Sequence, residues 1–246
     1  MDIGKSFSYP FEDRQWVSKL GLGALVSLIP ILNFAWSGYM VGIVRNMMSN
    51  AQEPLPNWDD LDKKFMDGLV LFLVGLVYAL PIIVLSLLSF SMMSIPAILS
   101  GSQDMQGIAE GIAGVGGVMF TGMICLFGVY GLVLSVIFPA IMIMYAREGT
   151  FASCFKLGEI FSLIGKNAGA FFTAWGVSIV GGLVVGLVAG IAQMVLGLIP
   201  CIGWIASLVI TLGVGVYISM IYAHLFGQFA QQVFGQTPLL TADQPA

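Results

Sequence analysis

The chain has 246 residues, of which 58% are hydrophobic and 9% charged, and its formal net charge is −4. Soluble domains carry roughly 25% charged residues, so this composition excludes an ordinary soluble fold, and the lack of a basic surplus excludes a typical nucleic-acid-binding surface. The cysteines at positions 125, 154 and 201 are scattered, which predicts neither a disulfide framework nor a metal site. We therefore expect a single all-α integral membrane domain that contacts membrane lipids and holds no cofactor.

The start of the chain predicts an interfacial segment followed by a broken apolar one. Residues 1–19 mix acidic and basic side chains without an apolar core, so no cleavable signal peptide is expected there. Residues 20–44 carry no charge but contain Pro30 and Asn33, which favours a re-entrant hairpin over a fifth span of about 37 Å. The sequence around Pro30 also resembles that around Pro200, as in a weak internal repeat of hairpin turns.

Four later runs are each apolar enough to cross a bilayer. A membrane-spanning helix needs about 20 apolar residues, and none of these runs contains Asp, Glu, Lys or Arg. The last two are separated by Pro200 and are expected to form a tight hairpin, and residues 236–246 are expected to be a flexible tail. The predicted spans are 69–93, 115–145, 168–198 and 202–227.

The basic residues predict how these spans are oriented. Loops 45–66 and 147–166 carry basic residues, whereas loop 94–114 has none. Basic residues favour the cytoplasmic side, so both loops and the C-terminus are predicted to be cytoplasmic in a multi-pass protein of the cell membrane. A re-entrant hairpin would place the basic residues of the 1–19 segment on the same side, and a fifth span would place them outside.

A proline-rich stretch precedes the first of the four spans. Its prolines favour an extended approach to a helix, for which Asn57 or Asp59 is the predicted N-cap. We interpret Trp58, Asp59 and Asp60 mainly as structural, with partner contact, metal binding or acid–base chemistry as the alternatives. Salt bridges between residues spaced i,i+4 are expected to brace this helix: Asp59–Lys63, Asp60–Lys64 and Lys63–Asp67.

Residues 150–165 predict an amphipathic helix in the cytoplasmic interface, with Thr150 as its N-cap. An alternative use of its apolar face, which includes Phe155 and Phe161, is docking of a soluble protein partner. The predicted face consists of Phe151, Cys154, Phe155, Leu157, Phe161 and Ile164.

Small residues recur every fourth position in the last two predicted spans. Helices in lipid associate through close contact of such residues, so these ridges predict an intimate helix pair within the chain, with a homo-oligomer interface as the alternative. The ridges include Gly182, Gly186 and Gly190 in one helix and Gly215 and Ser219 in the other.

Few polar side chains lie within the predicted spans. His224 is the single histidine, and a packing role is favoured over a functional one, although an ionisable group inside a membrane is a functional candidate by default. Asn33 and Gln193 either line a path through the bundle or bond helices to one another. No arrangement typical of a hydrolase, a zinc enzyme or a nucleotide-binding site is present in the sequence, so we do not expect an enzyme.

Several motifs together resemble a broad bacterial and archaeal membrane-protein family catalogued as a domain of unknown function. The resemblance covers residues 5–230, implies the same topology and a prokaryotic cell membrane, and carries no activity. It departs from the family pattern at Ala51, where members often have proline. The matching motifs are Pro54-Leu55-Pro56-Asn57-Trp58-Asp59-Asp60, Phe65-Met66-Asp67-Gly68-Leu69, Tyr78-Ala79-Leu80-Pro81, Pro139-Ala140, Tyr145-Ala146 and Gly149-Thr150-Phe151.

Two functions from different classes follow from these observations. The first is a non-enzymatic scaffold or partner-binding subunit, which would use the small-residue ridges and the cytoplasmic face. The alternative is a small-solute or ion transporter or channel with a site between the Pro30 and Pro200 hairpins, since broken helices in corresponding halves are typical of transporters. The lack of acidic and basic residues inside the spans favours the first function.

Overall fold

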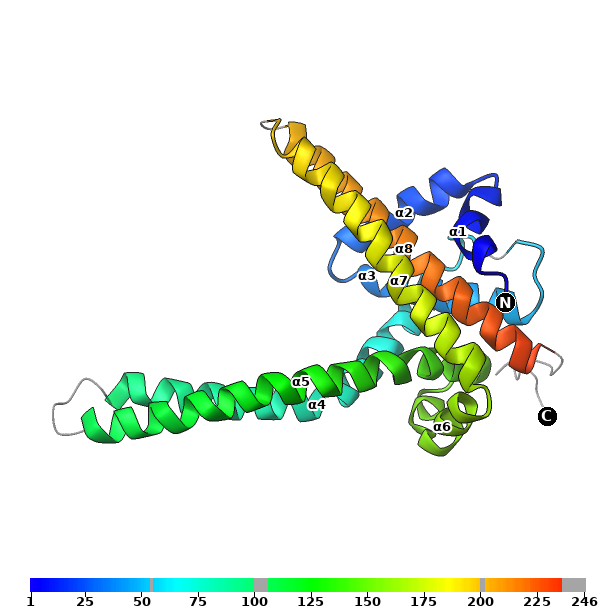
Figure 1. The fold of residues 1–246 in the computed structure, drawn as a ribbon. Helices are drawn as coiled ribbons and strands as arrows, with labels where there is room; N and C mark the ends of the chain where they lie inside the picture. The colour runs from blue at the N-terminus through cyan, green and yellow to red at the C-terminus, as the bar shows by residue number, and fades with distance from the viewer. Residues whose placement is uncertain (54, 100–105, 200–201, 236–246) are drawn as a thin grey trace. The chain divides into compact units, whose positions relative to one another are not determined.

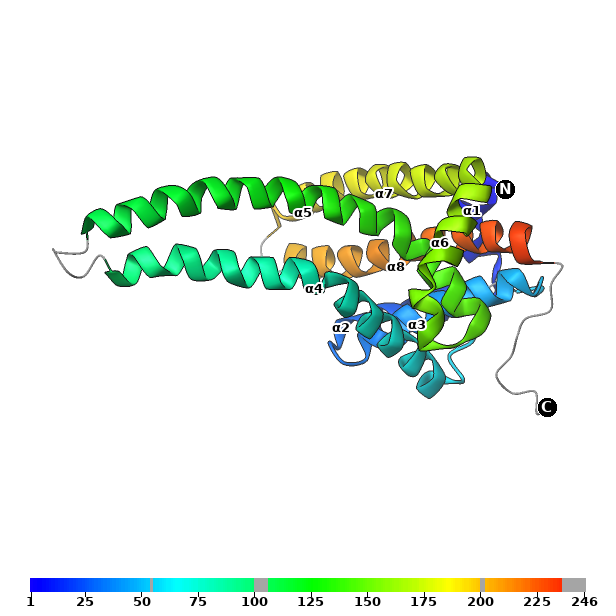
Figure 2. The same cartoon turned by 90° about the horizontal axis from the view of Figure 1, so that it is seen from below.

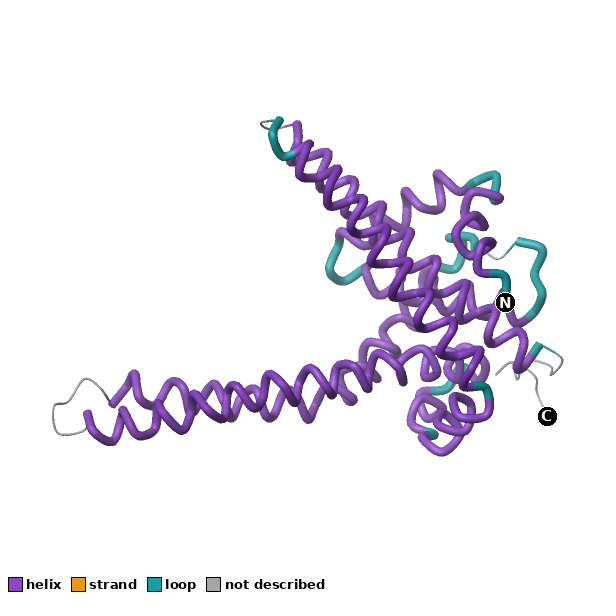
Figure 3. The backbone as a smooth tube through the Cα atoms, in the orientation of Figure 1, coloured by secondary structure: helices purple, strands orange, loops and turns teal. Residues whose placement is uncertain are grey.

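The computed structural model describes residues 1–53, 55–99, 106–199 and 202–235 (Figure 1). In this part of the chain every regular element is a helix, which confirms the all-α fold class (Figure 3). The elements in chain order are α1 (Ile3–Glu12), α2 (Trp16–Leu28), α3 (Asn33–Met48), α4 (Leu61–Leu99), α5 (Gln106–Glu148), the 3-10 helix η2 (Phe151–Phe155), α6 (Leu157–Lys166), α7 (Ala168–Leu196) and α8 (Ile202–Phe234).

Four helices in the described part are long and apolar enough to cross a membrane, as predicted, and they are consistent with a multi-pass membrane protein. They have 29 to 35 residues, or roughly 44–53 Å at about 1.5 Å per residue. A hydrocarbon core is about 30 Å thick, so each helix is longer than the core. The four segments are Leu61–Ser91, Gly114–Glu148, Ala168–Leu196 and Gly203–Phe234.

The chain divides into two compact units. The second unit, residues 73–138, is an antiparallel hairpin formed by parts of α4 and α5, in which the Tyr130 hydroxyl donates to the Tyr78 carbonyl at 2.6 Å. The first unit contains residues 1–72 and 139–246, which include α1–α3 and α6–α8. All of the polar networks below lie in the first unit.

Helix α8 is the central element of the first unit, and most of its buried residues lie in its C-terminal half. Phe226 and Phe229 are fully buried and pack on Phe171 of α7 with ring centroids 5.5 and 5.4 Å apart. Near its start, Trp204 is 80% exposed and Ile205 68%. The α7–α8 pair, whose helices run side by side in Figures 1 and 2, therefore presents a large apolar surface to its surroundings at one end.

The segment 20–44 is not one continuous helix, because α2 ends at Leu28 and α3 begins at Asn33. Asp2 bonds with Gln228 and Asn50 with Gln231, both on α8. The start of α1 and the end of α3 thus lie at the same end of α8, which is the arrangement of a hairpin. Entry of this hairpin into a bilayer stays a prediction.

The predicted N-cap differs from the structure at α4 but not at η2. Helix α4 begins at Leu61, and the Lys64 N–H donates to the Asp60 carbonyl at 3.1 Å, so Asp60 precedes the helix and neither Asn57 nor Asp59 is its N-cap. Thr150 is the N-cap residue of η2, as predicted, although its side chain makes no capping bond.

The segment 150–165 is also not a single helix. The backbone departs from helical geometry at Lys156, between η2 and α6, and this break rotates the two parts against each other. As a result Cys154 and Ile164 are buried, whereas Phe151 and Phe161 are exposed. The predicted apolar face is therefore split, with an exposed part that also includes Leu157.

The small-residue ridges contact their neighbours less than predicted. A Cβ on Gly182 would lie 3.5 Å from Ile218 of α8, but one on Gly186, Gly190 or Gly215 would meet nothing within 4 Å. These three glycines therefore do not form the contact between α7 and α8. Ser219 instead accepts a hydrogen bond from the Trp36 indole of α3 at 3.1 Å. The predicted turn at Pro200 and the predicted tail 236–246 lie outside the described residues.

Candidate functional site

The single histidine lies in a buried polar cluster between α1 and α8. The Asp2 N–H donates to Gln228 Oε1 at 2.7 Å, and Gln228 Nε2 donates to the Asp2 carbonyl at 2.9 Å. This pair of backbone bonds fixes which end of the Gln228 amide is oxygen. Gln228 Nε2 then faces His224 Nδ1 at 3.1 Å and Ser6 Oγ at 3.0 Å. Helix α1 is thereby held to α8 by side chains 218 or more positions apart.

The amide of Gln228 has more acceptors within reach than it has hydrogens. Its two N–H bonds face the Asp2 carbonyl, Ser6 Oγ and His224 Nδ1, so Nδ1 either accepts a hydrogen bond or donates one to Ser6 Oγ. Tyr9 stacks on the ring with centroids 3.9 Å apart and donates its hydroxyl to the Met220 carbonyl at 3.0 Å. Because Tyr9 is buried, its pKa is raised well above the usual value, and this side chain stays a neutral donor.

A cavity of about 460 Å³ adjoins this cluster, and His224 is part of its wall. His224 is 1% exposed, and its Nε2 makes no hydrogen bond with any described residue. The other lining residues come from α1 and the residue before it, from the end of α3 and the segment that follows it, and from α8. They are Asp2, Lys5, Glu12, Met47, Asn50, Ala51, Gln52, Gln228 and Gln231.

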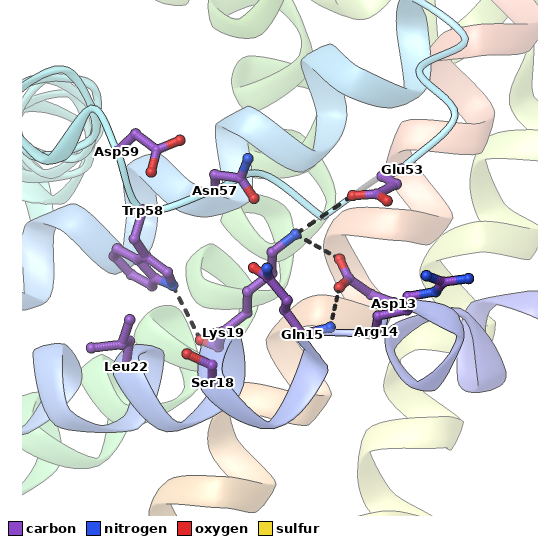
Figure 4. Close-up of a pocket in the computed structure, with 10 residues that line it drawn as sticks. All are labelled: Asp13, Arg14, Gln15, Ser18, Lys19, Leu22, Glu53, Asn57, Trp58 and Asp59. Atoms are coloured by element: carbon purple, nitrogen blue, oxygen red, sulfur yellow. Dashed lines mark hydrogen bonds and ion pairs between the residues drawn. The ribbon is translucent and has the colours of Figure 1, made fainter.

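A second cavity, of about 470 Å³, lies where the proline-rich stretch meets α2 (Figure 4). The Lys19 ammonium bonds with Asp13 at 2.6 Å and with the Leu55 carbonyl at 3.2 Å, and it lies 3.9 Å from Glu53. Trp58 donates its indole N–H to the Lys19 carbonyl at 3.2 Å, as Figure 4 shows. The proline-rich stretch is thus bonded to the first turn of α2.

Trp58 also completes an aromatic stack with α3. Its ring lies 4.7 Å from that of Tyr39, and Trp36 lies 5.2 Å from Tyr39, all nearly parallel. The Tyr39 hydroxyl is buried and has no hydrogen-bond partner among the described residues. Burial, together with the charge of Asp13, raises the pKa of Tyr39. The stack therefore serves as a neutral, apolar contact between α3 and the proline-rich stretch.

An ion pair and a hydroxyl connect three helices at a third place. Both Arg45 terminal nitrogens bond with the Asp67 carboxylate, NH2 at 3.2 Å, and the Tyr145 hydroxyl donates to the same carboxylate at 2.8 Å. Arg45 Nε also donates to the Ala146 carbonyl at 3.1 Å. Asp67 therefore pairs with α3 and α5 rather than with Lys63, its predicted partner on α4.

Comparison with known families matches residues 22–194 to the family described as "Protein of unknown function (DUF4013)". The chain belongs to this family. No curated protein and no solved structure matches the chain. The resemblance to a membrane-protein family of unknown function is thereby confirmed.

In this DUF4013 protein the predicted pathway residues do not converge. Gln193 bonds with Thr211 at 3.2 Å, and Thr211 precedes His224 by 13 positions on α8, which is about 20 Å along the helix. Asn33 is the first, exposed residue of α3. Only His224 lines one of the two polar cavities described above.

The remaining predicted site residues fall into two groups. Trp58 and Asp59 line the cavity beside Lys19, and Asp60 precedes α4. Phe155 is half-buried and packs on Phe151 with ring centroids 5.0 Å apart, whereas Phe161 is exposed.

The hydrogen-bond partners of His224 are only partly predictable from the sequence. Gln228 lies at helical spacing from His224, but nothing in the sequence around Ser6 or Asp2 indicates that they bond with α8.

Proposed function

We propose that this DUF4013 protein is a non-enzymatic subunit of the cell membrane that binds a protein partner, with its C-terminus in the cytoplasm. The observation that supports it is the use of four charged side chains as structural pairs: Arg45 with Asp67, and Lys19 with Asp13, join helices to one another. Groups engaged in such pairs are not available for proton transfer or ion binding. The chain then acts through its surface.

Two exposed apolar regions supply that surface. One is the end of the α7–α8 pair, where Leu187 is 67% exposed and Trp204 80%. The other is the exposed part of η2 and α6, where Phe161 is 53% exposed. Exposed apolar patches of this kind mark contacts with lipid or protein, and the α6 patch lies directly before the first residue of α7.

Site-specific photocrosslinking in intact membranes tests this proposal. A photoreactive amino acid is placed at Leu187 or Phe161, and at the fully buried Phe171 as a matched control. We expect a discrete protein adduct at an exposed position and only intramolecular adducts at Phe171. Adducts with lipid alone at both exposed positions would contradict the proposal.

The transporter alternative predicts a different outcome. Purified protein in liposomes would then carry H⁺, Na⁺ or K⁺ across the bilayer, measured with dyes for pH and membrane potential. We expect no flux above that of empty liposomes, since Gln193 and His224 lie about 20 Å apart along the bundle.

A further inference from the structure

We propose that the cavity beside His224 binds a small zwitterion, in which an oxyanion and an ammonium group are joined by a short linker. The inference goes beyond the proposed partner binding and does not depend on it. It rests on a buried histidine with one nitrogen that has no partner among the described residues, on a lysine that forms no ion pair with any of them, and on two carboxylates, all lining one cavity of about 460 Å³.

The first step is the donor that His224 offers. Gln228 Nε2 and Ser6 Oγ lie 3.1 and 3.0 Å from Nδ1, and we place the ring proton on the other nitrogen, Nε2, which makes no hydrogen bond with any described residue. The ring is nine-tenths buried or more and lines the cavity. The buried polar atoms that lack a partner in the described part of the chain include the Tyr39 hydroxyl but not His224 Nε2. Nε2 is therefore accessible, and an acceptor atom of a ligand in the cavity can bind its N–H.

The second step is the charge that accompanies this donor. Lys5 lines the same cavity and forms no ion pair with any described residue. It neighbours Ser6, which bonds to His224 Nδ1 at 3.0 Å. An ammonium and an imidazole N–H that line the same cavity favour an oxyanion, because charge-assisted hydrogen bonds are about twice as strong as neutral ones. The amide of Gln52 adds a further donor to this wall.

The third step is the opposite charge at the far end of α1. Glu12 lies seven positions after Lys5, on the same face of the helix and about 10 Å along its axis. Asp2 also lines the cavity, and one of its carboxylate oxygens caps α1 by accepting from the Lys5 N–H at 3.0 Å. With one cation and two carboxylates, the wall has an excess of one negative charge. A plain anion is therefore less favourable than a ligand that also carries an ammonium group.

The position of the cavity gives two sources for such a ligand. His224 lies 22 positions after Ile202, or about 33 Å along α8, which is close to the thickness of a hydrocarbon core. A cavity at this level is accessible both to a free amino acid and to the headgroup of phosphatidylethanolamine. Both carry an oxyanion and an ammonium group.

The single histidine makes the test direct. Full-length protein is labelled with ¹⁵N-histidine, purified in detergent with a tag that contains no histidine, and its two ring nitrogens are observed by NMR. We expect the neutral Nε2–H tautomer and a saturable shift of Nε2 on addition of glycine or of glycerophosphoethanolamine. Saturation by glycine alone identifies an amino-acid site, and saturation by the headgroup alone identifies a lipid site.

Acetate and methylammonium are the contrasting probes, since each carries only one of the two charges. We expect both to bind about tenfold more weakly than the zwitterion. No shift with any probe, an Nδ1–H tautomer, or equal binding of acetate would overturn the proposal.

Two variants test the two ends of the ligand separately. Lys5→Gln and Glu12→Gln are each expected to weaken zwitterion binding about tenfold, and Lys5→Gln alone is expected to weaken acetate binding. Lys63→Gln, the same change at an exposed position on α4, is the matched control and should leave binding unchanged. If Lys5→Gln and Lys63→Gln behave alike, the oxyanion is not bound where we place it.

Discussion

Gly68 lies against Gly38 where α4 crosses α3, and a Cβ on Gly68 would come within 3.0 Å of the Gly38 nitrogen. The same Cβ would overlap the Phe34 carbonyl, and a Cβ on Gly38 would overlap the Lys64 carbonyl. The two backbones are therefore in contact, an approach that only glycine allows. This crossing fixes the first turns of α4 against the α2–α3 hairpin.

We expect Gly38→Ala and Gly68→Ala each to destabilise the protein by about 3 kcal/mol, since the added methyl meets rigid backbone. Thermal unfolding of the detergent-solubilised protein measures the loss. Gly186→Ala is the matched control, because its methyl would meet nothing within 4 Å. A melting temperature that falls equally in all three variants would show that helix composition, rather than the crossing, is responsible.

The Asp67 carboxylate is expected to stabilise the three-helix junction because it neutralises Arg45 and accepts from Tyr145. Removing one member of a buried ion pair costs about 3–5 kcal/mol, and the Arg45 side chain is 23% exposed. We therefore expect Asp67→Asn to cost about 2–3 kcal/mol and Tyr145→Phe about 1–2 kcal/mol.

Chemical unfolding of these variants and of the double variant measures the coupling between the two residues. Their effects should be less than additive, since both act on the same carboxylate. Glu148→Gln removes a pair with the half-exposed Lys156 and should change stability by less than about 1 kcal/mol. An equal loss in Glu148→Gln would contradict a special role for Asp67.

The apolar helices were predictable from the sequence, whereas the junctions between them were not. Long charge-free runs determine a span almost by themselves, because hydrocarbon excludes charged side chains. Asp67 shows the limit: spacing along α4 points to Lys63, but its partners Arg45 and Tyr145 are 22 and 78 positions away. Gly186 shows a second limit. A ridge of small residues indicates that a helix can pack closely against a neighbour, but not that the neighbour lies on that face of the helix.

The thiol of Cys154 should react slowly in the folded protein. Burial raises its pKa to about 11, from about 8.5 in an unfolded chain, and the thiolate is the reactive form. A pKa raised by folding means that the folded state keeps its proton to higher pH. The stability contributed by this group is therefore complete below about pH 8.5 and falls as the pH rises toward 11.

Maleimide labelling at pH 7 to 9 checks this expectation in a variant with Cys125→Ser and Cys201→Ser. The rate should stay low across this range and rise sharply once the protein is unfolded in denaturant. Labelling of the native protein that accelerates through pH 8.5 would mean that Cys154 is solvated.

The hairpin of α2 and α3 predicts that Ser8 and Gln52 are accessible from the same side of the membrane. Asp2 and Asn50 contact residues 228 and 231 of α8, so the segments that follow them lie at one end of that helix. Ser8 and Gln52 are exposed, whereas Asn50 has a positive φ of 56° that cysteine tolerates poorly.

Single cysteines at positions 8 and 52, in a background without native cysteines, are treated with a membrane-impermeant maleimide in spheroplasts and in inverted vesicles. Both should be labelled only in inverted vesicles, where the cytoplasmic side is outside. Labelling of the two positions from opposite sides would eliminate the hairpin in the membrane, and labelling of both only in spheroplasts would reverse the predicted orientation while keeping the hairpin.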